Sequence, residues 1–139
     1  MVKLNANKTS SRRKMRKEHF GATSVERRTR MCTALNADLK MKWKVNAVPI
    51  RSEDEVKVTR GKFVGYEGKV TGVYRKKYTV HVEKCTRDKA NGQTIPVGIN
   101  ASNLVITALK MDKCRRSLLQ RKGKTDAKAP AGSKLDIVD

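Results

Sequence analysis

Three glycines beside lysines occupy the stretch GKFVGYEGKV, residues 61–70. Glycines this close to cations can form a phosphate-binding loop, which requires G-x-x-x-x-G-K-[ST] between a strand and a helix. Here Gly61 and Gly65 are one residue too close, and the lysine after Gly68 is followed by Val70, which has no hydroxyl group to bind magnesium. The dinucleotide pattern G-x-G-x-x-G is absent too. The spacing argues against a nucleotide site and favours tight turns, because glycine adopts a positive φ without steric cost.

Residues suited to acid–base or metal chemistry are scattered along the chain. His81 lies in a predicted strand without a nucleophile nearby in sequence, and His19 lies in a basic run. The acidic run at 53–55 has the residue types of an acid–base site. A better explanation is that the run marks the start of a strand and that its carboxylates pair with neighbouring cations. The chain has three widely spaced cysteines, Cys32, Cys85 and Cys114, and no C-x-x-C pair. This pattern favours reduced thiols in the cytosol or nucleus. We therefore expect no catalytic residue, no metal site and no cofactor.

The charge of the chain predicts a polyanionic partner. Lys and Arg number 33 against 13 Asp and Glu, a formal net charge of +20, which a compact fold does not tolerate well without counter-charges. Residues 1–51 carry 14 basic and 3 acidic side chains, whereas residues 52–110 carry 11 and 6. The middle of the chain is therefore the candidate core. The sequence contains no apolar run of about 18 residues, so it predicts no membrane-spanning helix. The N-terminal sequence lacks the apolar stretch of a secretory signal.

Helical patterns occur on both sides of this middle section. Residues 8–20 (KTSSRRKMRKEHF) predict a marginal helix with cations on all sides, which phosphates would order; the alternative is a solvated, disordered tail. Residues 23–35 predict a short helix, because Thr23 and Glu26 have capping-box spacing. A partial apolar stripe would run along it through Val25, Met31, Cys32 and Leu35.

Further helical signals come later in the sequence. Asn36 is expected to cap another turn that runs to Trp43, whose ring we expect to pack on the core rather than to stack on a base. The helical pattern returns from Met111, and the composition after Gly123 predicts a flexible tail.

The middle section changes to a period of two. Alternation is clearest where Val56 and Val58 share one face of a strand, and Gly72 suggests a bulge or a close backbone approach. Pro96 places its strand at a sheet edge. Five short strands leave no room for helices between them and imply a small antiparallel barrel; their ranges are 55–59, 69–74, 78–83, 93–99 and 103–109.

A family resemblance rests on motifs within this section. The segment EVKVTRGKFVGYEGKVTGVYRKKYTV resembles a KOW motif of ribosomal and transcription-elongation proteins, with Gly65 at its eleventh position, the hallmark glycine. Further motifs follow in order: VPIRSEDEVKV (48–58), GKV (68–70), VYRKKY (73–78), VEKCTRDKANG (82–92) and VGINASNLVITALKMDKCR (97–115). Together they resemble the large-subunit ribosomal proteins numbered twenty-four in the universal scheme and twenty-six in the eukaryotic one. The chain departs from relatives at Val64, where lysine is common, and in a shorter glycine loop.

The resemblance implies a mainly β fold, an SH3-like antiparallel barrel (KOW domain) with basic, partly helical extensions. The expected parts are an N-terminal extension (1–47), the barrel (48–110) and a C-terminal helix with a tail (111–139). It also implies a structural, non-enzymatic constituent of the large ribosomal subunit that stabilises rRNA near the exit tunnel and contributes to assembly. Partners would be large-subunit rRNA and neighbouring ribosomal proteins, with no small-molecule substrate and no membrane insertion. The location would be cytoplasmic, and nucleolar during assembly in a eukaryote.

Basic side chains are the expected rRNA contacts, because guanidinium groups bind phosphates or stack on bases and lysines act as point charges. Each basic group could instead be a solvated surface. The candidates are Arg12, Arg13, Lys14, Arg16, Lys17, His19, Arg27, Arg28, Arg30, Arg51, Arg60, Lys62, Arg75, Lys76, Lys77, Arg87, Lys89, Arg115 and Arg116. The structural glycines of the motif would be Gly61, Gly65 and Gly68.

Two other classes of function stay open at this point. One is a KOW-type factor of transcription elongation or RNA processing, although that class usually adds further domains. The other is an enzyme or a cationic membrane-surface protein. The sequence offers no constellation of polar groups for the enzyme and no amphipathic apolar face for the membrane protein.

Overall fold

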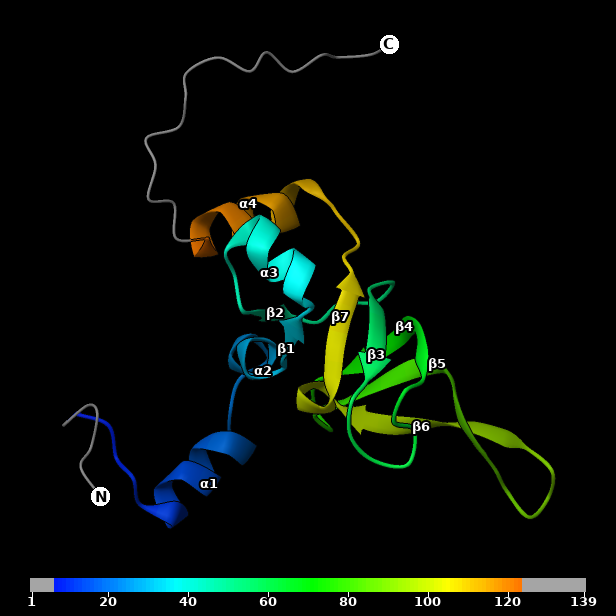
Figure 1. Ribbon diagram of the computed structural model, residues 1–139. Helices are drawn as coiled ribbons and strands as arrows, with labels where there is room; N and C mark the ends of the chain where they lie inside the picture. The colour runs from blue at the N-terminus through cyan, green and yellow to red at the C-terminus, as the bar shows by residue number, and fades with distance from the viewer. Residues whose placement is uncertain (1–6, 124–139) are drawn as a thin grey trace, which may run out of the picture.

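The computed structural model describes residues 7–123 of the chain, so the tail expected after Gly123 lies almost wholly outside the described residues. A curved sheet forms the centre, and helices lie around one end of it (Figure 1). The elements are α1 (Arg12–Phe20), α2 (Ser24–Arg30), β1 (Cys32–Leu35), α3 (Ala37–Trp43), β2 (Ala47–Pro49), β3 (Glu55–Val58), β4 (Glu67–Tyr74), β5 (Thr79–Asp88), β6 (Thr94–Asn100), the 3-10 helix η1 (Ala101–Asn103), β7 (Leu104–Ala108) and α4 (Lys113–Lys122).

The sheet has seven strands within the described residues, in the order β2-β1-β7-β3-β4-β5-β6. All neighbouring pairs are antiparallel except β1 and β7, which run parallel. The predicted mainly β, barrel-like fold with helical extensions is confirmed, with this one parallel pair as a difference. All five predicted strands are present, and β6 with its Pro96 lies at the sheet edge, as expected. The register shift between Val70 and Gly72 confirms an irregularity at Gly72.

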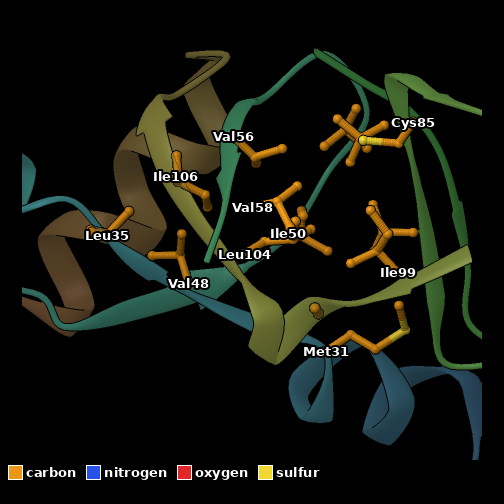
Figure 2. Close-up of a cluster of buried hydrophobic side chains, with 14 of the residues drawn as sticks. Met31, Leu35, Val48, Ile50, Val56, Val58, Cys85, Ile99, Leu104 and Ile106 are labelled. Carbon is orange, nitrogen blue, oxygen red and sulfur yellow. The ribbon is translucent and has the colours of Figure 1, made fainter. Parts of the chain in front are cut away.

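The core is lined by alternate residues of the strands. Val56 and Val58 of β3 and Val80 and Val82 of β5 are all at most 2% exposed. Figure 2 shows the side chains of β3, β7 and neighbouring strands converging in one apolar cluster, which also takes in Met31. Burial of one face of each strand explains why the period of two predicted these elements correctly.

The helix predicted over residues 23–35 is correct only in its first half. The capping box exists, since the Thr23 hydroxyl accepts from the Glu26 N–H and the Glu26 carboxylate accepts from the Thr23 N–H. The chain then leaves the helix, and Cys32–Leu35 forms β1 between β2 and β7. The predicted apolar stripe does not exist, because Val25 is 70% exposed. Pairing with β2 and β7 satisfies the backbone groups of β1, and the strand buries every second side chain in the core.

Two of the three motif glycines form the turn that was expected. Gly61 and Gly65, in the loop between β3 and β4, have φ values of +98° and +88°, which side chains with a Cβ rarely adopt. Gly68 is different, because it lies within β4, where a Cβ would come 2.9 Å from the Glu83 carbonyl oxygen. The prediction that Gly68 shapes the turn is wrong; it allows β4 and β5 to approach each other.

The helices α3 and α4 lie side by side at one end of the sheet (Figure 1). Asn36 caps α3 as predicted, with its Oδ1 accepting from the Ala37 N–H at 2.8 Å. Trp43 is half-buried against the core, which confirms the packing role expected for it. Leu119 of α4 is fully buried, and Lys122 donates to the Ala47 carbonyl oxygen at 3.2 Å. The division of the chain at 47/48 and 110/111 stays a prediction.

Candidate nucleic-acid interface

The basic N-terminal lead forms a helix that the rest of the described residues, 7–123, leaves exposed. α1 lies apart from the sheet in Figure 1, and none of its residues is buried. Its five cations are all exposed: Arg12, Arg13, Lys14, Arg16 and Lys17. A short helix with no buried face gains little stability from the protein itself. Its cations are therefore available to a partner of opposite charge.

One junction connects α1 to the sheet. The Tyr78 hydroxyl donates to the His19 carbonyl oxygen at 2.6 Å, and the two rings stack with centroids 4.2 Å apart. The Arg27 guanidinium lies over the Tyr78 ring at 5.2 Å and donates to the carbonyl oxygens of Phe20, Ala22 and Lys76. Since Lys76 belongs to the turn between β4 and β5, this junction holds the end of α1 against that turn.

The turn itself carries Arg75, Lys76 and Lys77, all exposed. The junction therefore brings two of the predicted basic groups together, although about sixty residues separate them in sequence. We call the five cations of α1 and the three cations of this turn the joined basic surface. The two nearest carboxylates in sequence are already occupied, Glu18 by Arg30 at 2.6 Å and Glu26 by the capping box. The Thr23 backbone and hydroxyl donors lower the Glu26 pKa, so this carboxylate stays ionised in the box.

The remaining exposed candidates lie on other parts of the sheet. Arg60 and Lys62 are on the loop between β3 and β4. Lys89 is at the turn of the hairpin β5–β6, which extends away from the body in Figure 1. Arg87 lies outside the predicted strand ranges, which end at 83 and resume at 93, but the structure has it on β5, because this strand continues to Asp88. Nothing in the described structure joins these cations to the joined basic surface.

The candidates Arg27, Arg30 and Arg51 hold the structure together as well as carrying charge. Arg27 forms the junction, Arg30 pairs with Glu18, and Arg51 pairs with Asp112 at 2.5 Å. The sequence pattern showed their charge but not their partners, because the partners lie on other elements. Arg28 is half-buried on α2, and Arg116 is exposed on α4.

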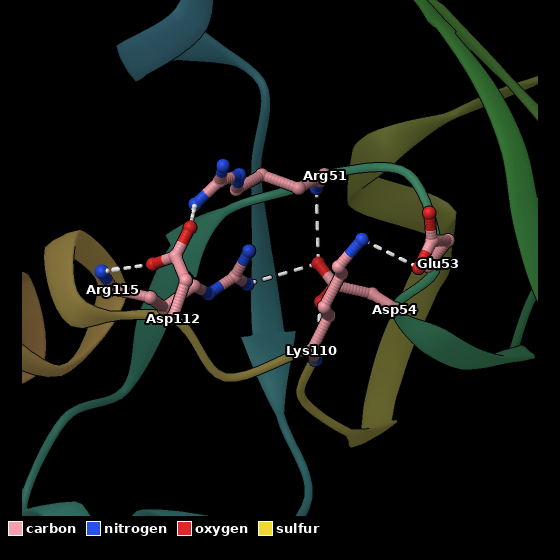
Figure 3. A network of polar contacts seen from close by, with 6 residues as sticks. All are labelled: Arg51, Glu53, Asp54, Lys110, Asp112 and Arg115. Atoms are coloured by element: carbon pink, nitrogen blue, oxygen red, sulfur yellow. Dashed lines mark hydrogen bonds and ion pairs between the residues drawn. The ribbon is translucent and has the colours of Figure 1, made fainter.

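Arg115 is not at the surface. Its side chain is 3% exposed and donates through Nη2 to Asp54 Oδ2 at 2.9 Å (Figure 3). Burial lowers the Arg115 pKa, while the Asp54 carboxylate raises it in opposition. Arg115 is therefore not an exposed cation, because it balances a buried carboxylate in the first turn of α4; a contact between Arg115 and rRNA stays a prediction.

Two residues of the acidic run 53–55, Glu53 and Asp54, pair with cations, as expected. Glu53 pairs with Lys110 at 2.5 Å, which lowers the Glu53 pKa. Asp54 is fully buried and accepts from the N–H groups of Arg51 and Lys110 as well as from Arg115. Asp112 caps α4, and the Arg115 N–H lowers its pKa. These contacts connect α4 to the strand β3.

Other chemistry has little support in the described part of the chain. No group of three or more His, Cys, Asp or Glu side chains within residues 7–123 could hold a metal ion. None of the helices in this range has the length and apolar character needed to span a bilayer. The three cysteines are free, and burial raises the pKa of the Cys32 and Cys85 thiols.

Sequence reasoning missed Tyr78 as a residue of the interface. It was expected only as the first residue of a strand, yet it has a φ of +56° and joins β5 to α1. The only signal in the sequence is a tyrosine next to three cations, which does not reveal a contact with His19. That contact depends on how α1 and the turn meet in space.

Comparisons with known proteins agree with this architecture. The family model that describes the ribosomal proteins L26 of eukaryotes and L24 of archaea matches residues 9–122. The chain belongs to this family. Curated relatives named large ribosomal subunit protein uL24 include one from Dictyostelium discoideum, 51% identical over 91% of this chain and 91% of its own length. Those from Schizosaccharomyces pombe and Candida albicans are 49% and 46% identical, each over 88% of this chain and 97% of their own length.

Membership of this ribosomal protein family confirms the resemblance drawn from the motifs. The family consists of structural ribosomal proteins, so the expectation of a protein without enzymatic activity is also confirmed. The enzyme alternative is wrong, and the match along residues 9–122 favours the ribosomal protein over a transcription-elongation factor. The KOW and SH3-like assignments stay predictions.

Proposed function

We propose that this protein is a structural constituent of the large ribosomal subunit that binds and stabilises large-subunit rRNA. The relatives from three organisms are named as large-subunit proteins and align over 91–97% of their own length, which supports a shared role. The observation that carries rRNA binding is the joined basic surface, where Tyr78 and Arg27 hold a helix of exposed cations beside a second group of cations.

Phosphate neutralisation is the mechanism that this surface supports. The exposed arginines of α1 can each hold a phosphate through two N–H donors, and the lysines of the turn act as point charges. Contacts of this type set the position and orientation of the protein on folded RNA and carry little sequence information. RNA would also cover α1, which lacks a buried face in the isolated protein.

The sheet would act as a rigid base from which the basic elements extend. Arg60, Lys62, Arg87, Lys89 and Arg116 would make further contacts with rRNA from the loop, the hairpin β5–β6 and α4. By family resemblance, the site would be in the 5′ domain of the large rRNA, near the exit tunnel and neighbouring ribosomal proteins, and binding would contribute to early assembly. The protein would then be cytoplasmic, passing through the nucleolus in a eukaryote.

Sedimentation and salt dependence test this proposal together. In cell extract at high salt, the protein should co-sediment with large subunits; sedimentation as free protein or with polymerase would contradict the proposal. The purified full chain should bind a transcript of the 5′ domain and lose on the order of 10³–10⁵ in affinity between about 50 and 200 mM salt if it contacts about 6–10 phosphates. A nearly flat salt dependence would contradict the electrostatic mechanism.

A further inference from the structure

A small cavity lies between α2, the end of β2 and α4. Its volume is about 30 Å³, and three of its lining residues are arginines from different elements: Arg28, Arg51 and Arg115. The other lining residues are Pro49, Cys114 and Leu118, so no carboxylate lines the cavity among the described residues. Three guanidinium groups around a cavity without an acidic residue form an environment suited to an anion.

Arg115 brings unsatisfied donors to this cavity. Only Nη2 is hydrogen-bonded, to Asp54, while Nε and Nη1 have no partner among the described protein atoms although the side chain is 3% exposed. Figure 3 shows one guanidinium nitrogen of Arg115 facing Asp54 and another turned toward the Arg51 side chain. Buried donors on a charged group are costly to leave without an acceptor, so this position calls for an oxygen atom.

The local charge favours the same conclusion. Burial has the largest effect on the Arg115 pKa and lowers it, and the positive charge of Arg51 lowers it further. The two cations therefore repel each other. Arg28 makes no side-chain hydrogen bond or ion pair with any residue of the described range. Asp54 and Asp112, which do not line the cavity, pair with Arg115 and Arg51, so two of the three arginines are balanced and one positive charge is left in excess.

We propose that this cavity is a specific site for one phosphate group of an RNA backbone. Its volume corresponds to about one water molecule, whose share of liquid volume is roughly 30 Å³. It therefore admits one phosphate oxygen, which accepts from Arg115, while the rest of the group stays at the mouth with Arg28 and Arg51. The bound phosphate bridges α2 and α4. Free phosphate offers the same oxygen atoms as an RNA backbone. The choice of RNA as the ligand therefore rests on the proposed function.

The first experiment uses inorganic phosphate as the probe. The arginine side-chain N–H signals of the full chain are followed by NMR while phosphate is added, with chloride at equal ionic strength as the reference. The Arg115 Nε–H signal should shift saturably with phosphate only. The variant Arg28→Gln, which breaks no hydrogen bond or ion pair among residues 7–123, should weaken this binding by about tenfold, because it removes a charged donor. Arg121→Gln on α4, an exposed arginine that does not line the cavity, is the matched control and should leave phosphate binding unchanged.

The second experiment separates the two sources of phosphate. The 5′-domain transcript is added to the full chain, and the same Arg115 signal should shift in the complex for the original chain and shift less for Arg28→Gln at the same concentrations. A complex that forms without moving the Arg115 signal would show that RNA does not enter the site. A response to phosphate no larger than to chloride would show that the cavity holds only water and would overturn the proposal. Failure of the complex itself would contradict the proposed function, while the phosphate titration would still decide the site.

Discussion

The hydroxyl of Tyr78 donates a 2.6 Å hydrogen bond to the backbone carbonyl of His19, and their rings stack 17° from parallel. These residues are 59 positions apart, yet they hold together the end of the basic helix α1 and the turn between β4 and β5. Because α1 has no buried residue of its own, its position depends on this contact, the bonds of Arg27 and the ion pair of Glu18 with Arg30. The arrangement of the joined basic surface depends on them.

Removing the Tyr78 contact should loosen α1. Tyr78→Phe loses only the hydrogen bond, at a cost of about 0.5–1.5 kcal/mol, and Tyr78→Ala also loses the ring stack. We expect amide exchange in α1 to be fastest, and rRNA binding weakest, in Tyr78→Ala. Tyr78→Phe should be intermediate between Tyr78→Ala and the original chain. Tyr66→Phe, an exposed tyrosine in the loop before β4, is the control. Equal exchange of α1 in all variants would show that Tyr78 does not position the helix.

Replacement of four α1 cations by alanine should separate RNA binding from folding. The variant Arg12→Ala, Arg13→Ala, Arg16→Ala, Lys17→Ala should reduce the slope of log affinity against log salt by up to about 3, since each lost phosphate contact contributes about 0.7–0.9. Its melting temperature should barely change, because none of these side chains is buried. The variant Lys40→Ala, Lys42→Ala, Lys69→Ala, Lys113→Ala, which removes four exposed cations elsewhere, is the control for the same change in net charge. A large drop in melting temperature would mean that α1 belongs to the folding core.

The buried pair of Asp54 and Arg115 should dominate the attachment of α4. Asp54→Asn leaves a buried cation without its counter-charge and should cost about 3–5 kcal/mol of unfolding free energy. Adding Arg115→Met removes that cation, so the double variant should be less destabilised than the sum of the two single variants. Urea unfolding of all four proteins measures the coupling. Strict additivity would indicate that the two charges do not interact in the folded state.

Gly68 should tolerate no side chain. A Cβ there would lie 2.9 Å from the Glu83 carbonyl oxygen, so Gly68→Ala forces β4 and β5 apart and should cost about 1–3 kcal/mol. Lys69→Ala, the exposed next residue of the same strand, should stay within about 0.5 kcal/mol. Urea unfolding compares the two variants. Similar stabilities for both would mean that the strands can separate without cost at this position.

Acid should destabilise the fold through three carboxylates. The pKa values of Glu26, Glu53 and Asp112 are lowered by hydrogen bonds and nearby cations, from ordinary values of 4.5, 4.5 and 3.8. The unfolded chain therefore binds more protons in this range, and stability rises with pH. We expect constant stability above these ordinary values and a loss as the pH falls through the lowered ones. Urea midpoints measured against pH test this, and Glu53→Gln should flatten the curve.

Local patterns were enough to predict most elements. Alternation at Val56 and Val58 marks a strand because one face of the sheet is buried, and the Thr23–Glu26 spacing marks a helix start because the two side chains satisfy local N–H groups. The positive φ at Gly61 and Gly65 is likewise a local property. Each of these features depends on neighbours a few residues away, which the sequence displays directly.

The candidate site was predictable in composition but not in arrangement. The sequence identified the cations of α1 and of the turn at 75–77, but their union depends on Tyr78 and Arg27 meeting elements far away in the chain. It also predicted Arg115 as an exposed cation, because a charged residue in a basic helix is usually solvated. The buried carboxylate of Asp54, 61 positions earlier, reverses that expectation.

The sequence alone therefore determined the mainly β fold, the positions of strands β3 to β7 and of the turn at Gly61 and Gly65, the excess of positive charge and the family. Only the tertiary structure decided that Cys32–Leu35 leaves the helix to pair with β2 and β7. It also decided that Gly68 lets β4 and β5 approach each other closely, and which arginines reach the surface. The physical reason is the range of the interactions. Periodicity and capping act over a few residues, whereas strand pairing, burial of a charge and contact between elements exist only once distant segments meet.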